Sequence, residues 1–240
     1  MKLGRTILIL CLGAICASAQ LGGLLKKVNG NKTGTDTTAV MAQGQDMLAY
    51  MTIATDNGIK AVEALASVFP PDKVQKVADL AAKYNELKAK RSDQNIDAES
   101  IQVASQIAAE MAQLDSEWQT HLKEKSAAVK KADARLALVI LADALAAAKA
   151  PETAKAMQGA AQDLKSDPTQ VSKVNRMLSM AMILTTVGKE APQQANSFRT
   201  VRGTAKRIAD AEKVQLASDP SPDKVKDKVA LDTATKELAE

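Results

Sequence analysis

The residue types that carry most enzyme and metal chemistry are scarce in this chain. His121 is the single histidine, and Cys11 and Cys16 are the two cysteines. One histidine cannot supply the repeated Glu-x-x-His helices of a di-iron bundle or the paired histidines of a zinc protease. Glu117 and Glu124 stand within four residues of His121, so a carboxylate and an imidazole could share a helix face. We interpret this charged stretch as a solvated surface and keep His121 as one candidate metal ligand.

The sequence contains none of the common catalytic or nucleotide-binding motifs that we considered. There is no G-x-S-x-G, no phosphate-binding P-loop and no G-x-G-x-x-G. A serine nucleophile needs a positioned base and an oxyanion hole, and one histidine leaves little choice of base. A glycosidase-like carboxylate pair could be assembled from the many acidic residues, but the chain holds only one Trp, two Tyr and two Phe to line a sugar site. The sequence therefore predicts a protein that is not an enzyme.

A run of three closely spaced methionines is the sharpest local signal. Met177, Met180 and Met182 fall within six residues, and thioethers suit Cu(I) in an oxidising compartment. On a helix Met177 and Met180 share a face, whereas Met182 lies about 200° round from Met180. Methionine also fills irregular gaps in cores. We therefore expect core packing and no resident cofactor, and we keep Met177 and Met180 as candidate metal ligands of a Cu(I) or haem carrier.

Basic side chains cluster once in helical register. Arg199, Arg202 and Lys206 fall on one side of a helix and Arg207 lies beside them, opposite an apolar face. Such a stripe is most often solvated, but it could also bind phosphate groups of lipopolysaccharide or lipid, or a protein partner. Nucleic acid is excluded as a partner by the predicted export and by the shortage of aromatic residues for stacking.

The N-terminus reads as a cleavable secretory signal peptide. Lys2 and Arg5 supply a positive region, residues 7–15 are apolar, and residues 17–19 (Ala-Ser-Ala) offer small side chains for cleavage before Gln20. The apolar run spans nine residues, whereas a membrane-spanning helix needs roughly 20. No later stretch approaches that length without a charge, so we expect no transmembrane segment.

The two cysteines suggest a compartment. Both fall within the signal, so the exported chain has no thiol. Lipid attachment at Cys16 is disfavoured because Ile15 is bulkier than the residue that usually precedes a lipid-modified cysteine. A chain of about 220 residues can bury a core without disulfides. We therefore expect a periplasmic or secreted bacterial protein. Removing Lys2 and Arg5 leaves 30 basic and 28 acidic residues, a net charge of +2, so bulk charge predicts no strong polyanion partner.

Composition predicts an all-α fold, an elongated bundle of about six helices. Aromatic residues make up 2% of the chain, and Gly and Pro are sparse, while good helix formers fill most positions. Apolar periodicity, prolines and turn residues delimit the predicted helices. These are 38–69, 72–91, 97–149, 151–165, 168–187 and 192–217, followed by a short segment at 223–238. The third would be about 75 Å long, so either it bends near Ser126 or the protein is elongated.

The predicted organisation has four parts. Residues 1–19 are the signal peptide, 20–37 a flexible glycine-containing leader, 38–217 the helical bundle domain and 218–240 a short amphipathic tail. We expect an exported, non-enzymatic binding or structural protein of the bacterial cell envelope, whose partner is another envelope protein or surface. The alternative is a carrier of a small ligand or metal in a methionine-lined bundle. Self-association into a homo-oligomer stays open.

Overall fold

The computed structural model describes residues 36–91, 95–114 and 126–238. The predicted signal peptide, the leader up to residue 35, and His121 lie outside these ranges. Residues from Thr37 onward form one compact unit. Its described part contains six α-helices and two short 3-10 helices and no strand, which confirms the predicted all-α, multi-helix bundle.

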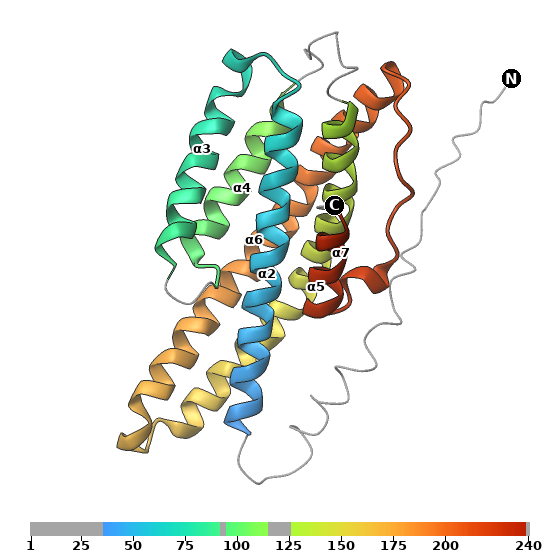
Figure 1. Cartoon of the computed structure of the whole chain (residues 1–240). Coiled ribbons are helices and arrows are strands. Elements are labelled where there is room, and N and C mark those ends of the chain that lie inside the picture. The colour runs from blue at the N-terminus through green and yellow to red at the C-terminus, as the bar shows by residue number, and fades with distance from the viewer. Residues whose placement is uncertain (1–35, 92–94, 115–125, 239–240) are drawn as a thin grey trace, which may run out of the picture. The chain divides into compact units, whose positions relative to one another are not determined.

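Figure 1 shows the described helices in chain order, and residues 212–227 form a long connection before the last of them. The six α-helices are α2 (Thr37–Ala66), α3 (Pro71–Lys90), α4 (Ala98–Gln113), α5 (Ser126–Leu164), α6 (Val171–Ala211) and α7 (Lys228–Glu237). The 3-10 helices are η1 (Pro168–Gln170) and η2 (Pro222–Val225). The most extensive contact joins α5 to α6, and α2 packs on both. Helix α4 packs on α6 and α2, α3 covers α4, and α7 lies against α2.

Local sequence sets several helix starts. Asp97 caps α4 by accepting a hydrogen bond from the Ser100 backbone N–H at 2.7 Å. At the next start, residues 167–170 (Asp-Pro-Thr-Gln) have the sequence pattern of an N-cap, a first-turn proline and a capping-box glutamine. Asp167 accepts a hydrogen bond from the Thr169 N–H at 2.9 Å, which confirms the predicted cap. The first turn is 3-10, and the Gln170 side chain donates to Thr169 Oγ1 at 3.5 Å, so Gln170 does not close the capping box.

The predicted long helix at 97–149 is wrong. Helix α4 ends at Gln113, where Leu114 is extended with ψ 112°, and α5 starts at Ser126. The physical reason lies in what each half packs on. The Gln194 side chain of α6 donates to the Ile101 carbonyl of α4 at 3.0 Å, and α5 also packs along this part of α6. Both halves lie on the same partner helix, so the chain must reverse between them.

Two predicted helix starts, at Pro151 and Pro192, are also wrong. Pro151 lies inside α5 and Pro192 inside α6. A proline within a helix removes one backbone hydrogen bond and crowds the preceding turn. Here the turns on both sides remain packed against neighbouring helices, and a Cβ added at Gly188 would lie 2.8 Å from Pro151 Cγ. Gly188 makes room for the Pro151 ring, and buried residues before and after each proline keep α5 and α6 packed through these positions.

Two apolar clusters make up the core, and α2, α5 and α6 run through both. The first cluster includes Met51, Ala146 and Leu184, and the second includes Leu136 and Phe198. Near their junction four helices each bury a polar side chain: Thr55, Ser100, Asp143 and Gln194.

Candidate functional site

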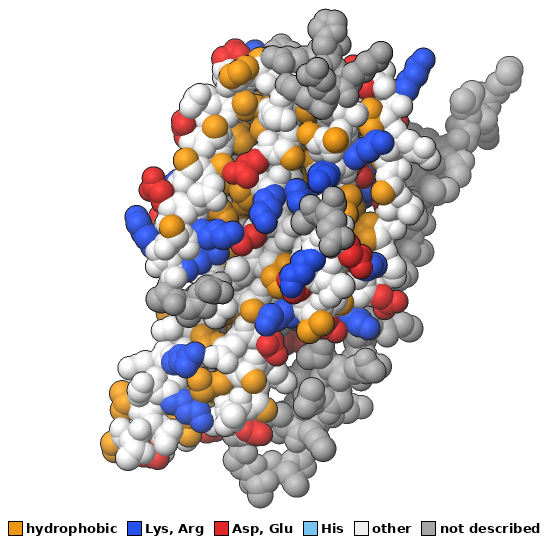
Figure 2. All heavy atoms as spheres, viewed as in Figure 1, with side chains coloured by type: hydrophobic (Ala, Val, Ile, Leu, Met, Phe, Trp, Pro, Cys, Tyr) orange, Lys and Arg blue, Asp and Glu red, His pale blue; other side chains and the backbone are white. Residues whose placement is uncertain are grey.

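Charged side chains of both signs are mixed on the face of the molecule that Figure 2 shows. Figure 2 shows Lys and Arg interspersed with Asp and Glu over one face, with apolar side chains between them. This mixture agrees with the near balance of basic and acidic residues in the sequence. A binding surface therefore has to come from a local arrangement of cations and not from the overall charge.

A groove between α5 and α6 provides such an arrangement. It encloses about 410 Å³, within the range of small-molecule sites. Its apolar side comes from α5 and its cationic side from α6, and the segment after α6 adds one carboxylate, that of Asp219. The lining residues are Ala137, Ile140, Leu141, Arg199, Arg202, Gly203, Lys206 and Asp219. Because Ile140 packs on the second core cluster and Leu141 on the first, the floor of the groove is anchored in both.

Arg202 is fixed at the bottom of the groove by Asp133 of α5. Its Nε donates to Asp133 Oδ1 at 2.9 Å and its Nη2 to Asp133 Oδ2 at 3.2 Å. The Asp133 side chain is only 2% exposed, so this bidentate pair is shielded from water and holds the guanidinium plane in one orientation. The same Nη2 also donates to Asp219 at the rim.

Arg199 and Lys206 lie on either side of Arg202 along α6, and both are exposed. Arg199 Nη1 donates to the neutral Asn196 Oδ1 at 2.7 Å. Within the described ranges, no ion pair joins Arg199 or Lys206 to a carboxylate. The Arg199 charge acts on Asp143 and the Lys206 charge on Asp219, in each case without a direct ion pair. The side-chain donors of both residues that face the groove can therefore still bind an anion that enters it.

The structure brings together three of the four basic residues singled out in the sequence. Arg207 does not line the groove. Its Nη2 donates instead to Thr204 Oγ1 of the preceding turn at 3.0 Å. On an α-helix Arg207 lies about 100° from Lys206, which is enough to turn it away from the shared face.

Sequence reasoning missed the two acidic residues of the groove, Asp133 and Asp219. They are 69 and 17 residues from Arg202 along the chain, so no local pattern links them. One weak signal was present for Asp133, which lies on the helix face that buries Val129, Ala132 and Leu136. A buried carboxylate usually needs a cationic partner, and Arg202 is that partner. Asp219 carried no comparable signal.

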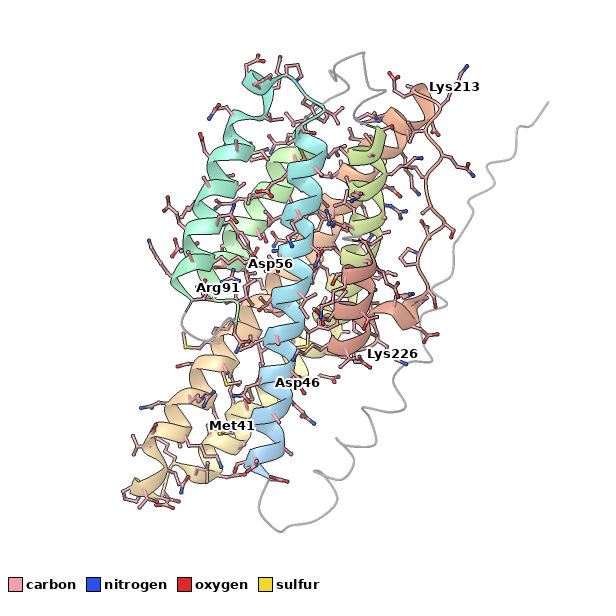
Figure 3. The ribbon with its side chains drawn as sticks, in the orientation of Figure 1. Met41, Asp46, Asp56, Arg91, Lys213 and Lys226 are labelled. Atoms are coloured by element: carbon pink, nitrogen blue, oxygen red, sulfur yellow. The ribbon has the colours of Figure 1, made fainter. Side chains whose placement is uncertain are left out.

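A second charged cluster ties α3 to α2 (Figure 3). Asp56 accepts from Tyr84 Oη at 2.6 Å and from Lys88 Nζ at 2.7 Å. The Arg91 side chain, 3% exposed, lies 3.9 Å from the same carboxylate and over the Tyr84 ring at 5.2 Å from its centroid. Burial, together with the Asp56 charge, raises the pKa of Tyr84. Tyr84 and Lys88 satisfy the Asp56 carboxylate, whereas Nε and Nη2 of Arg91 have no hydrogen-bond partner in the described chain. We assign this cluster to holding two helices together.

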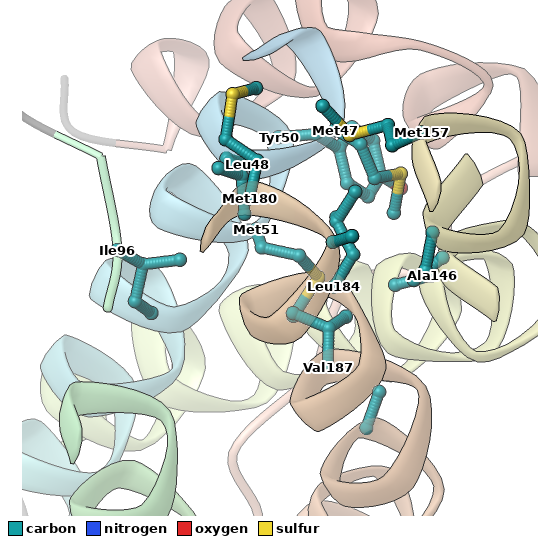
Figure 4. Close-up of a cluster of buried hydrophobic side chains, with 14 of the residues drawn as sticks. Met47, Leu48, Tyr50, Met51, Ile96, Ala146, Met157, Met180, Leu184 and Val187 are labelled. Atoms are coloured by element: carbon teal, nitrogen blue, oxygen red, sulfur yellow. The ribbon is translucent and has the colours of Figure 1, made fainter. Parts of the chain in front are cut away.

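The candidate metal ligands Met177 and Met180 are buried in the first core cluster, and Figure 4 shows Met180 among its neighbours there. Met47, Met51 and Met157 join them, so three helices contribute methionines to one part of the core. A Cβ added at Gly44 would lie 2.5 Å from Met157 Sδ and 3.0 Å from Met180 Cε, so the missing side chain of this glycine admits both methionines. The third candidate ligand, His121, lies outside the described residues. Across the described part of the chain, no cluster of three or more His, Cys, Asp or Glu side chains is placed to hold a metal.

Asp143 is the one core carboxyl without a hydrogen-bond partner in the described chain. Its side chain is fully buried, and neither Oδ1 nor Oδ2 accepts a hydrogen bond from another group. Burial raises the pKa of Asp143 well above its usual range, and the charge of Arg199 offsets part of that rise. The core therefore keeps this carboxyl uncharged up to a higher pH than water does.

Comparison with known proteins adds no assignment. None of the described helices combines the length and the apolar run that crossing a membrane requires. No known protein family, curated protein or solved structure matches the chain. The function therefore has to be inferred from the chemistry of the groove.

Proposed function

We propose that the protein is an exported, non-enzymatic binding protein of the bacterial cell envelope, and that it binds an anionic group of its partner in the α5–α6 groove. One observation carries this proposal. Arg199 and Lys206 form no direct ion pair with a carboxylate within the described ranges, and they flank a third cation, Arg202, beside an apolar floor. An anion there would gain charge-assisted hydrogen bonds.

The groups in the groove favour binding over catalysis. A general acid or base works best when its pKa lies near the working pH. Arginine and lysine stay protonated at neutral pH, and the hydrogen bond from Arg202 lowers the pKa of Asp219 below its usual range. The groove therefore presents fixed charges, which suit the recognition of an anion and not proton transfer.

Export is supported by the sequence. The basic residues, the apolar run and the small residues at 17–19 have the order of a secretory signal. We expect cleavage before Gln20, and intact-mass measurement on protein recovered from the periplasm or medium of an expressing bacterium checks it. A mass that retains residues 1–19, or a diacylglycerol adduct on Cys16, would contradict this part of the proposal.

Binding is tested with 1-anilinonaphthalene-8-sulfonate, a fluorescent probe that joins a sulfonate to apolar rings. We expect saturable binding by the mature protein. The double variant Arg199→Gln/Lys206→Gln should weaken it by on the order of tenfold, because two charge-assisted contacts are lost. Added salt should weaken it too.

The matched control removes two charges from the same helix outside the groove. Arg176 and Lys189 are exposed on α6 and do not line the groove. Arg176→Gln/Lys189→Gln should therefore leave the affinity for the sulfonate probe unchanged. Equal effects of the two double variants would mean that net charge and not the groove attracts the probe, and would overturn the proposal.

A second candidate function is that of a Cu(I) or haem carrier. The gathering of five buried methionines from α2, α5 and α6 favours it. Soft thioethers are suitable Cu(I) ligands, but unbranched thioethers also pack well in cores. The tight contacts of Met157 and Met180 at Gly44 agree with packing, so the anion-binding groove remains the primary proposal.

A further inference from the structure

We infer that Asp219 is a built-in counter-anion of the groove, and that a soluble ligand with an anionic group on a short apolar chain displaces it from Arg202. The inference rests on the proposed function, since it names the ligand class and the regulation of the same groove. Three features of the described residues support it: a preset guanidinium, a loosely held carboxylate, and an apolar surface beside them.

The guanidinium keeps its position without Asp219. Asp133 binds both Nε and Nη2 of Arg202 through a bidentate pair at 2.9 and 3.2 Å. The Arg202 side chain is 13% exposed and that of Asp133 is 2% exposed. A bidentate pair shielded in this way fixes the side chain, so releasing Asp219 leaves a donor already aimed at the groove.

The Asp219 carboxylate is held far less firmly. Its side chain is 69% exposed, and exposed ion pairs contribute little to stability. Within the described chain, residues 215–220 make no backbone–backbone hydrogen bond. The segment is anchored at both ends instead, by the Val214 N–H to the Ala209 carbonyl at 2.7 Å and by Tyr50 Oη to the Val225 carbonyl at 2.8 Å. Asp219 can therefore leave Arg202 while both anchors stay in place.

The charges around the groove favour exchange for another anion. Asp133 already compensates one of the three cations, Arg199, Arg202 and Lys206. A ligand anion that replaces Asp219 at Arg202 Nη2 can also reach toward Arg199 and Lys206, which lie about one helical turn to either side. Within the described chain, Asp219 accepts a hydrogen bond from Arg202 alone, and the Lys206 charge acts on it without a direct ion pair. An exogenous anion that hydrogen-bonds Arg199 and Lys206 as well therefore gains direct contacts that Asp219 lacks.

The apolar floor defines the other half of the ligand. Ala137, Ile140 and Leu141 line the α5 side of the groove, and burying apolar surface there favours a chain over a bare inorganic ion. A volume of about 410 Å³ accommodates a short chain. We therefore choose hexyl phosphate as probe, with inorganic phosphate and hexanol as the probes that lack one half each.

The experiment is calorimetric titration of the full mature chain with the three probes at low ionic strength. Hexyl phosphate should bind more tightly than inorganic phosphate or hexanol. Asp219→Asn should tighten hexyl phosphate binding by about three- to fivefold, which is the scale of one exposed ion pair. The control Asp223→Asn removes an exposed carboxylate that does not line the groove and should change nothing.

A second readout distinguishes displacement from a change in net charge. Release from Arg202 should return the pKa of Asp219 upward toward its ordinary value, because the hydrogen bond that lowers it is lost. Carboxyl-carbon NMR titration with saturating hexyl phosphate measures this shift. An unchanged Asp219 pKa would overturn displacement.

The remaining outcomes separate the inference from the proposed function. If hexyl phosphate binds in a manner that requires Arg199 and Lys206, but Asp219→Asn binds no better, the groove stands and the counter-anion role fails. If neither hexyl phosphate nor the sulfonate probe binds, the proposed function fails as well. Binding to phosphatidylglycerol vesicles without binding to soluble hexyl phosphate would overturn the assigned ligand class in favour of a membrane surface.

Discussion

At the scale of single residues, the core places a carboxyl where an apolar side chain would be expected. Asp143 lies on the face of α5 that also buries Leu136, Val139 and Ala146. One turn away, Val139 packs near Gly58 of α2 together with Phe198 of α6. A charged carboxylate at this depth would be costly, and the raised pKa of Asp143 shows how the protein avoids that cost.

Asp143 should therefore make stability depend on pH. The unfolded chain releases this proton near pH 4, whereas the folded protein retains it to higher pH. The folded state then binds more protons, so the free energy of unfolding falls as pH rises through this window, by up to about 1.4 kcal/mol per pH unit. Asp143→Asn should remove this loss and be more stable than wild type at pH 8, by about 1 to 3 kcal/mol. Urea denaturation at pH 4 and pH 8 measures both effects.

The control for this pH effect is Glu152→Gln, which neutralises an exposed carboxylate on the same helix. It should follow the wild-type pH dependence. If wild type and Asp143→Asn lost equal stability between pH 4 and pH 8, the pH dependence would have to come from other groups.

The buried methionines give a second residue-scale prediction, which decides between packing and metal. Met177→Leu/Met180→Leu should alter stability by less than about 1.5 kcal/mol, because leucine and methionine are nearly equal in volume. Competition titration with a chromogenic Cu(I) chelator should show no withdrawal of copper by either protein. Met182→Leu, at a side chain 72% exposed, is the matched control. Stoichiometric withdrawal that disappears in the double variant alone would establish the carrier.

The sequence predicted only those features of the groove that depend on the helical periodicity of neighbouring residues. Helical spacing was enough to put Arg199, Arg202 and Lys206 on one side. It could not reveal Asp133 and Asp219, because the pairing of α5 with α6 and the return of the chain after α6 bring them there. Helical spacing also could not show that Arg202 forms ion pairs with carboxylates whereas Arg199 and Lys206 form none within the described ranges.

At the scale of elements, helix propensity predicts well which segments are helical but predicts poorly where a helix ends. The absence of Gly and Pro from 72 to 150 suggested few interruptions, yet α4 ends at Gln113. Conversely, Pro151 and Pro192 suggested breaks, yet both helices continue. In each case burial against neighbouring helices outweighs the local preference. Predicting this would require knowing which helices pack together.

The apolar stripe of α5 can be tested by a matched pair of substitutions. Leu136→Ala should cost about 2 to 5 kcal/mol, because Leu136 is fully buried in the second core cluster and alanine leaves a cavity. Lys130→Ala, at an exposed position on the same helix, should stay within about 0.5 kcal/mol. Urea denaturation gives both values, and a harmless Leu136→Ala would contradict the assignment of this face to the core.

At the scale of the whole molecule, the division of the core raises the question of whether its two parts fold together. The first and second clusters meet near a layer of buried polar side chains, which weakens apolar contact there. Helices α2, α5 and α6 nevertheless contribute residues to both clusters. Unfolding one cluster would leave half of each shared helix without a packing partner, and an isolated half-helix is only marginally stable in water.

We therefore expect residues 37–238 to unfold in one cooperative transition. Leu184→Ala removes a fully buried side chain from the first cluster, and Leu136→Ala does the same in the second. Each should lower the same single midpoint, by an amount corresponding to about 2 to 5 kcal/mol, with the helical signal in far-ultraviolet circular dichroism and the heat-capacity peak changing together. Two heat-capacity peaks, of which Leu184→Ala shifts one and Leu136→Ala the other, would show instead that the polar layer separates two independently folding halves. A single peak whose calorimetric and van't Hoff enthalpies agree would mean that the three through-running helices couple the clusters, and that the layer containing Asp143 is held within one folding unit.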